Sequence, residues 1–171
     1  MADLVPPGGP FSTFPGVDRY LLLLSGRARV AVGGAPWTTL VAGSDTLLGP
    51  FPADGPGVTR SVVEEAGLDL NVMWDRTTVC AEVAVARRDA VVRLDADTTI
   101  LVALQPETRL HTSQGDELAL GFLDGLQVDV DVEGSTPALM ARVANGRVLV
   151  AKLMGLGDHG GELSSGTSAG A

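Results

Sequence analysis

Apolar and polar residues alternate along most of this chain in short runs, which are separated by glycine, proline, asparagine and aspartate. Alternation with a period of two is typical of a strand with one buried face, and turns about 8–12 residues apart are typical of a sandwich or barrel. The sequence therefore predicts an all-β protein with one domain over residues 1–156, built from two sheet-rich halves at about 1–77 and 78–156. Residues 157–171 are mostly glycine, serine, threonine and alanine, and we expect this tail to be disordered because it has no apolar face to pack.

Turn residues bound each of the predicted strands. Ser25-Gly26 and Asn145-Gly146 each lie between two adjacent strands and predict hairpins, because glycine and asparagine accept the left-handed dihedral angles of tight turns. A helix beginning at Pro137 is an alternative near the second of these turns. The predicted strands are Tyr20–Leu24, Arg27–Val32, Trp37–Val41, Val58–Glu64, Leu68–Trp74, Val79–Ala86, Ile100–Leu104, Leu118–Phe122, Leu126–Val132, Leu139–Val143 and Arg147–Leu153.

The composition argues against several classes of partner. The chain has 171 residues with 12 Lys and Arg against 21 Asp and Glu, a net charge of −9, which is the wrong sign for binding phosphates or anionic lipid headgroups. We therefore expect neither nucleic acid nor a membrane surface as a partner. The most apolar run, Tyr20–Leu24, is far shorter than the about 20 residues of a membrane-spanning helix. The first residues lack the pattern of a secretory leader, so a cytoplasmic location is the default expectation.

The residues that usually carry metal or nucleophilic chemistry are few. His111 and His159 are the only histidines and stand far apart in the sequence, so we expect no protein-built metal site and no cofactor. A half-buried strand residue is the favoured interpretation of His111. The single Cys80 excludes an intramolecular disulfide, and its apolar, strand-like surroundings favour a buried inert thiol over a nucleophile. No glycine-rich loop has the spacing of a nucleotide-binding motif.

Five charged or amide residues lie near strand ends, and all of them except Arg60 are candidates for a binding site. Arg19 precedes an apolar strand, and its forked guanidinium could bind a carboxylate at a barrel mouth; an ion pair with Asp18 or another surface acid is an equal alternative. Asn71 lies in an apolar strand, where a hydrogen bond bridging two strands is favoured over a ligand contact. Asp54 lies in a turn-forming segment that favours an Asx-type turn, and Arg76 is the last of the four.

The order and spacing of several segments resemble the HutD/Ves family of cupin-like proteins, over roughly residues 9–155. The resemblance implies a bicupin, that is, a cupin-like β-barrel or double-stranded β-helix repeated in two halves. It further implies a link in some bacteria to histidine utilisation, through sensing or limiting an intermediate such as formylglutamate, without cupin metal ligands and without an established catalytic activity. Arg19, Asp54, Asn71, Met73 and Arg76 match family motif positions and are carried over as candidate pocket residues. The matching segments are Gly9–Arg19, Leu22–Gly26, Pro50–Asp54 and Asp69–Arg76.

The chain departs from the family pattern at its start. The resemblance implies additional N-terminal strands with a Trp-Lys-Asn-Gly-Gly-Gly stretch, which do not precede Gly9 here, so either the gene model starts late or a shortened barrel has lost an edge. Because unpaired sheet edges are a liability, we expect a short form to cover its edge by homodimerisation or with Ala2–Pro10.

Three functions follow from the sequence. The first is a non-enzymatic protein that binds a small acidic metabolite through Arg19 or Arg76. The second is a metal-independent isomerase or lyase with Glu64 or Asp54 as its base. The third is a truncated structural or protein-interaction variant without a ligand.

Overall fold

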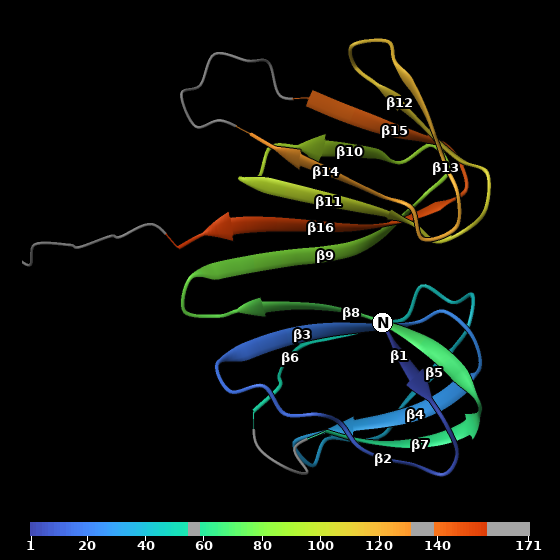
Figure 1. The fold of residues 1–171 in the computed structure, drawn as a ribbon, viewed down its shortest axis with the longest axis vertical. Helices are drawn as coiled ribbons and strands as arrows, with labels where there is room; N and C mark the ends of the chain where they lie inside the picture. The colour runs from blue at the N-terminus through green and yellow to red at the C-terminus, as the bar shows by residue number, and fades with distance from the viewer. Residues whose placement is uncertain (55–58, 131–138, 157–171) are drawn as a thin grey trace, which may run out of the picture.

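The computed structural model describes residues 1–54, 59–130 and 139–156, and these residues form sixteen β-strands and no helix (Figure 1). Accordingly, the described residues contain no helix that could cross a membrane. The strands are β1 (Ala2–Leu4), β2 (Gly8–Pro10), β3 (Val17–Leu23), β4 (Arg27–Val32), β5 (Thr38–Val41), β6 (Leu47–Pro52), β7 (Thr59–Glu65), β8 (Gly67–Asp75), β9 (Val79–Arg87), β10 (Val91–Leu94), β11 (Thr98–Ala103), β12 (Thr108–Thr112), β13 (Glu117–Leu120), β14 (Gly125–Asp129), β15 (Leu139–Asn145) and β16 (Arg147–Gly155).

The two halves of the chain have the same topology. In the N-terminal half the sheets have the strand orders β1-β8-β3-β6 and β2-β7-β4-β5, and in the C-terminal half they have the orders β9-β16-β11-β14 and β10-β15-β12-β13. Adding eight to each strand number of the first half gives the order of the second half. Two four-stranded antiparallel sheets with this strand order and connectivity form an eight-stranded jelly roll, which is the architecture of cupins. The prediction of an all-β, bicupin-like fold is therefore confirmed.

The predicted hairpins are wrong, although the strands on either side of each turn are present. β3 and β4 lie in different sheets, and so do β15 and β16. After β3, the amides of Leu24 and Ser25 donate to the carbonyl of Leu68, at 2.8 and 3.2 Å, so the chain stays paired with β8 before it crosses to the facing sheet. Gly26 has φ +82° and Gly146 has φ +89°. A glycine with positive φ can therefore lie at a corner where the chain crosses between sheets, and its presence does not by itself indicate a hairpin.

Other sequence predictions fall short in detail. The sequence did not predict β1, β2, β6, β10 or β12. Cys80 is exposed rather than buried, and it lies near the beginning of the edge strand β9. Pro137 and the end of the predicted strand Leu126–Val132 lie outside the described residues, as does the tail 157–171.

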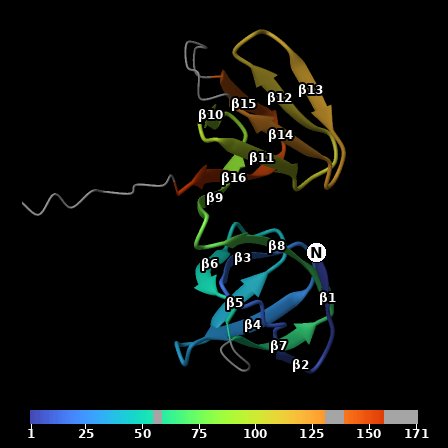
Figure 2. The same ribbon diagram turned by 60° about the vertical axis from the view of Figure 1, so that its left-hand side comes forward.

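The strands of the two halves form two separate bodies, one above the other (Figure 2). Each half has its own apolar core, and a third cluster joins the halves. The N-terminal core centres on Leu21, Val30 and Leu40, and the C-terminal core centres on Leu101 and Val143. The third cluster is built around Leu22, Leu104 and Leu149. Alternation along β3 explains this arrangement, because Leu21 faces the core of its own jelly roll while Leu22 faces the other half.

Polar contacts also join the halves. Asp45, between β5 and β6, accepts hydrogen bonds from Arg87 of β9 and, at 2.6 Å, from Arg147 of β16. Although burial alone would raise the pKa of Asp45, the hydrogen bonds and charges of the two arginines hold it below its ordinary value. The connection between the halves is therefore partly ionic.

The N-terminal segment occupies sheet edges of the first half. Ala2–Leu4 pairs with β8, and Gly8–Pro10 pairs with β7. The jelly roll consequently has all eight strand positions filled, and the expectation of a lost edge strand is not met. The alternative expectation, that Ala2–Pro10 covers the edge, agrees with this pairing.

Candidate ligand-binding site

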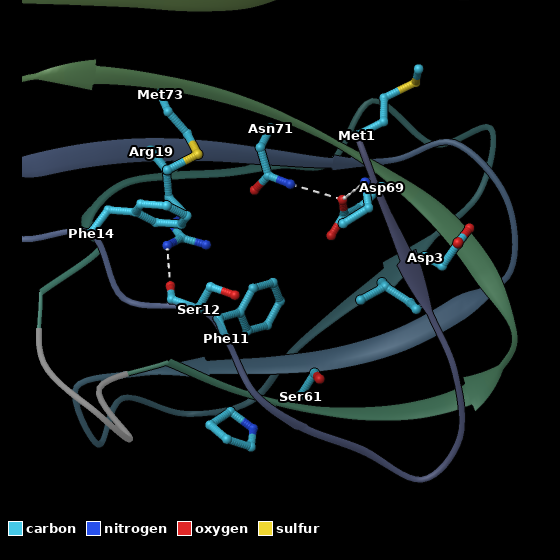
Figure 3. A pocket seen from close by; sticks show the side chains of 13 residues that line it. Met1, Asp3, Phe11, Ser12, Phe14, Arg19, Ser61, Asp69, Asn71 and Met73 are labelled. Carbon is cyan, nitrogen blue, oxygen red and sulfur yellow. Dashed lines mark hydrogen bonds between the residues drawn. The ribbon is translucent and has the colours of Figure 1, made fainter.

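A cavity of about 510 Å³ opens on the N-terminal jelly roll (Figure 3). Strands β1, β3 and β8 contribute one wall, and the end of β2, the segment that follows it and Ser61 of β7 contribute the other. Aromatic and aliphatic side chains alternate with a few polar groups around it, as is usual for small-molecule sites. The lining residues are Met1, Ala2, Asp3, Leu4, Pro10, Phe11, Ser12, Phe14, Arg19, Ser61, Asp69, Asn71 and Met73.

Arg19 is the most unusual lining residue. It lies on the inward face of β3 and is only 3% exposed. Its Nη2 donates a hydrogen bond of 2.7 Å to the carbonyl oxygen of Ser12, and its guanidinium carbon lies 5.6–5.8 Å from the ring centres of Phe11, Phe14 and Phe51. Within the described residues it forms no ion pair. The alternative of a pair with Asp18 is therefore wrong, since Asp18 lies against Arg76 instead.

Burial lowers the pKa of the Arg19 guanidinium, and the negative charge of Asp69 opposes this effect. An arginine remains protonated at physiological pH despite such a shift. The cavity therefore contains a fixed positive charge, which the three aromatic rings stabilise through cation–π contacts. One nitrogen, Nε, is buried and has no hydrogen-bond partner among the described residues.

Asp69 and Asn71 line the same cavity from β8. Asp69 is fully buried, and its Oδ1 accepts hydrogen bonds from the Ala2 amide at 3.1 Å and from Asn71 Nδ2 at 2.8 Å. Burial raises the pKa of Asp69, although the Ala2 amide, the N-terminal charge, Arg19 and Asn71 act in the opposite direction. The predicted hydrogen bond of Asn71 exists, but it joins two residues of one strand rather than bridging strands. Figure 3 shows Asn71 between Arg19 and Asp69.

Met73 lines the cavity at its rim, where it is partly exposed. It pairs in register with Arg19 across β3 and β8. Of the five candidate residues from the sequence, the cavity therefore brings together Arg19, Asn71 and Met73.

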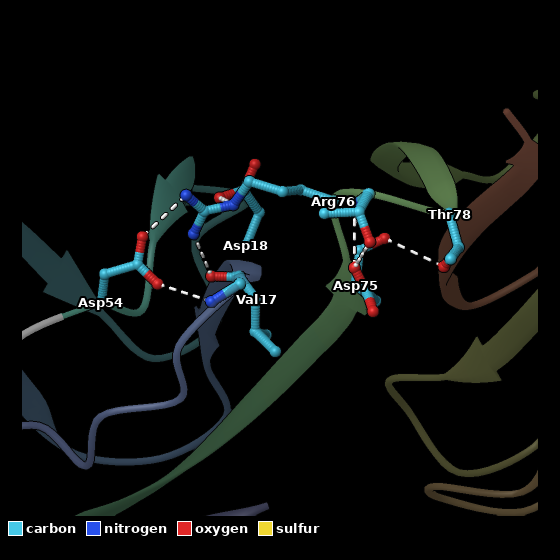
Figure 4. Close-up of polar contacts among 8 residues, drawn as sticks. Val17, Asp18, Asp54, Asp75, Arg76 and Thr78 are labelled. Carbon is cyan, nitrogen blue, oxygen red and sulfur yellow. Dashed lines mark hydrogen bonds and ion pairs between the residues drawn. The ribbon is translucent and has the colours of Figure 1, made fainter.

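Asp54 and Arg76 lie elsewhere and bind each other (Figure 4). Arg76 Nη1 lies 2.7 Å from Asp54 Oδ2, Arg76 Nε lies 3.0 Å from Asp18 Oδ1, and Arg76 Nη2 donates to the Val17 carbonyl at 2.8 Å. The hydrogen bonds that Arg76 and the Gly16 amide donate hold the pKa of Asp54 below its usual range. This network fixes the turn before β3 and the end of β8. Neither residue lines the cavity, and the second residue of an Asx-type turn at Asp54 lies outside the described residues.

The remaining sequence candidates lie outside the cavity. Glu64 is exposed and forms ion pairs of 2.8 and 2.9 Å with Arg27 and Arg29. His111 lies half-buried on β12, as expected for a polar strand residue. The described residues contain no cluster of three or more histidine, cysteine or acidic side chains that could hold a metal ion.

Sequence reasoning missed Asp69, Ser12, Ser61 and the two phenylalanines Phe11 and Phe14 as site residues. The signal for Asp69 was present, because residues two apart on a strand share a face and Asn71 was already a candidate. No comparable signal exists for Ser61, whose hydroxyl donates to the Gly9 carbonyl at 3.2 Å across a pair of strands far apart in the sequence.

A tandem jelly roll whose first copy contains an arginine-bearing cavity defines a bicupin-type protein. The model of one family, HutD, matches residues 1–144, and the chain belongs to the HutD family. Its fold is similar to the structure of HutD from Pseudomonas fluorescens SBW25, determined in a formate condition, with a TM-score of 0.69 and 19% identity over 91% of this chain and 77% of that one.

It is equally similar to a conserved protein of unknown function, PA5104 from Pseudomonas aeruginosa PAO1, with a TM-score of 0.69 and 21% identity over 89% of this chain and 77% of that one. At these identities the similarity shows a shared fold. No protein of curated function matches the sequence. The resemblance found in the sequence is thus confirmed at the level of family and fold.

Proposed function

We propose that this protein is a non-enzymatic, small-molecule-binding protein whose N-terminal jelly roll holds a small carboxylic acid against Arg19. One observation carries the proposal: a guanidinium that is 3% exposed borders an open cavity and has no carboxylate partner among the described residues. A buried charge without an opposite charge is costly. An anionic ligand would supply that charge.

The chemistry of the cavity suits such a ligand. A guanidinium binds a carboxylate through parallel N–H groups, and these charge-assisted hydrogen bonds are about twice as strong as neutral ones. The phenylalanine rings provide apolar contact for a short carbon chain. A volume of about 510 Å³ lies within the roughly 300–1,000 Å³ typical of small-molecule sites.

The family suggests where such a protein would act. HutD membership makes an acidic intermediate of histidine utilisation, such as formylglutamate, the first ligand to try, and a regulatory role in that pathway follows as part of the proposal. The proposal leaves Arg76 out of the binding role, because its guanidinium already pairs with Asp18 and Asp54.

Titration calorimetry with formylglutamate and simpler carboxylates tests this function. We expect Arg19→Met, which removes the charge but keeps much of the side-chain volume, to weaken binding at least about tenfold, because a charged hydrogen bond contributes about 1.5–3 kcal/mol. Arg29→Met is the matched control, since Arg29 also lies 5.8 Å from an aromatic ring, that of Trp37, but faces away from the cavity. Absence of binding below millimolar concentration, or equal binding by Arg19→Met, would contradict the proposal.

An isomerase or lyase is a second candidate, with a different base from those expected. Glu64 is on the surface and Asp54 has a lowered pKa, whereas Asp69 is a cavity carboxyl with a raised pKa. A carboxyl of this kind is suited to general acid–base chemistry. If the protein is such an enzyme, a bound acid should take up deuterium from solvent at a carbon atom, and Asp69→Asn should abolish this uptake. That result would support this candidate over simple binding.

A cooperative thermal melt without binding or turnover would instead favour the third function, a structural or protein-interaction variant without a ligand.

A further inference from the structure

The cavity contains an unpaired donor near one end and unpaired acceptors toward the other. Arg19 supplies the donor, since its Nε is buried without a partner among the described residues. Asn71 Oδ1 and Asp69 Oδ2 supply the acceptors, and both are likewise buried without a hydrogen bond in the described part of the chain. Native proteins leave few such groups unsatisfied, so each requires an explanation.

The fold itself does not require these polar groups. In the C-terminal jelly roll, β16 occupies the place that β8 occupies in the N-terminal one. Its inward-facing residues are Val148 and Val150, which belong to the apolar core. The equivalent strands therefore carry core valines in the C-terminal jelly roll, and Asp69 and Asn71 at the cavity of the N-terminal one.

From this arrangement we infer that the ligand carries a hydrogen-bond donor as well as a carboxylate, and that Asn71 and Asp69 are the residues that select for the donor. The inference rests on the proposed function, because it takes Arg19 as the carboxylate partner. It narrows the ligand class to small hydroxy, amino or amido acids. A simple fatty or dicarboxylic acid would leave both acceptors without a partner.

The strand register gives the scale of the separation between Arg19 and Asn71. Arg19 is in register with Met73, and Asn71 is two residues further along β8, which corresponds to about 7 Å of strand. A carboxylate with a donor three or four carbons away fits this span. Pentanoate, 4-hydroxybutyrate and 4-aminobutyrate have the same number of non-hydrogen atoms and differ only in the terminal group.

Calorimetric titration of the full chain with these three acids tests the inference. We expect 4-hydroxybutyrate or 4-aminobutyrate to bind at least about tenfold more tightly than pentanoate, because a site with buried acceptors discriminates against a ligand that lacks the donor. In Asn71→Leu, which replaces the amide by an apolar group of similar size, we expect this preference to fall and the affinity for pentanoate to persist. Asn145→Leu makes the same change at an exposed residue of β15 and leaves the preference intact.

The outcomes separate the two proposals. If all three acids bind equally and binding still requires Arg19, the donor inference is overturned, the acceptors hold water, and the proposed function stands. If neither these acids nor formylglutamate binds, both fail. If only formylglutamate binds, the proposed function stands and the span assigned to the ligand is overturned. A preference that persists in both Asn71→Leu and Asp69→Asn would also overturn the assignment of the selecting residues. If a variant does not fold, the comparison of the three acids on the wild-type protein still decides whether the ligand needs a donor.

Discussion

At the scale of single residues, the cavity of the N-terminal jelly roll contains charged side chains whose burial is unfavourable. Arg19 and Asp69 are both buried, and they do not form an ion pair with each other. An ionised carboxylate in such surroundings costs stability, which is why its pKa rises. The residues that form the site are thus ones that a purely structural core would avoid.

The raised pKa of Asp69 predicts a specific pH dependence of stability. Below the ordinary aspartate pKa, about 3.9, the carboxyl is protonated in both the folded and the unfolded chain. As the pH rises from there through the higher folded-state pKa, the unfolded chain releases its proton first, so the wild type loses stability. Asp69→Asn cannot titrate and lacks this loss.

Urea unfolding of both proteins between about pH 3 and about pH 7 measures this difference. The free energy of unfolding of the wild type should fall relative to that of Asp69→Asn as the pH rises through this window. A difference that is constant with pH, or that changes in the opposite direction, would show that the Asp69 pKa is not raised.

At the scale of elements, corners between sheets determine the fold, and they are the part that the sequence predicted least well. Alternation identified the long strands correctly, because one buried face imposes it directly. Strands β1 and β2 have three residues each, which are too few to show a period, and β6 contains Gly49, Pro50 and Pro52. Pairing between distant strands leaves no local trace, so the corner at Ser25-Gly26 was mistaken for a hairpin.

For the candidate site, the sequence likewise identified individual residues but not the contacts between them. Arg19, Asn71 and Met73 were found because a polar or motif residue in an apolar strand stands out. Asp54 and Arg76 stood out equally, but their mutual ion pair depends on the approach of two distant turns. The unpaired atoms that define the cavity are a property of the packed structure alone.

Gly67 provides a test of the corner geometry. A Cβ at this position would lie 1.9 Å from the carbonyl oxygen of Ser25, which is backbone and cannot move aside freely. We expect Gly67→Ala to destabilise the protein by about 2–4 kcal/mol, as measured by chemical denaturation. Gly9→Ala is the control, since a Cβ at Gly9 meets nothing within 4 Å. Equal stability of the two variants would mean that Gly67, at the start of β8, does not approach Ser25, between β3 and β4, as closely as the structure shows.

At the scale of the whole molecule, Asp45 joins the two jelly rolls. Removing it leaves Arg147, whose side chain is only 15% exposed, without its carboxylate partner. We expect Asp45→Ala to lower the free energy of unfolding by about 1–3 kcal/mol. Asp95→Ala is the control within one half, because Asp95 binds Arg93 and Lys152 of the C-terminal jelly roll, and we expect a smaller loss there.

The contribution of Asp45 should also disappear in acid. Its folded-state pKa is lowered, because the two arginines outweigh the effect of burial, so its stabilising effect is present above the ordinary aspartate pKa and is lost as the pH falls through the folded value. Thermal melts of wild type and Asp45→Ala should therefore converge at low pH. A gap that persists undiminished in acid would assign the effect to packing rather than to charge.

The strand topology shared by the two halves has a consequence for substitutions in the ligand cavity. The C-terminal copy has its own apolar core and packs against the N-terminal copy through Leu22, Leu104 and Leu149. Substitutions in the ligand cavity of the N-terminal copy therefore leave the core of the C-terminal copy and the interface between the copies in place.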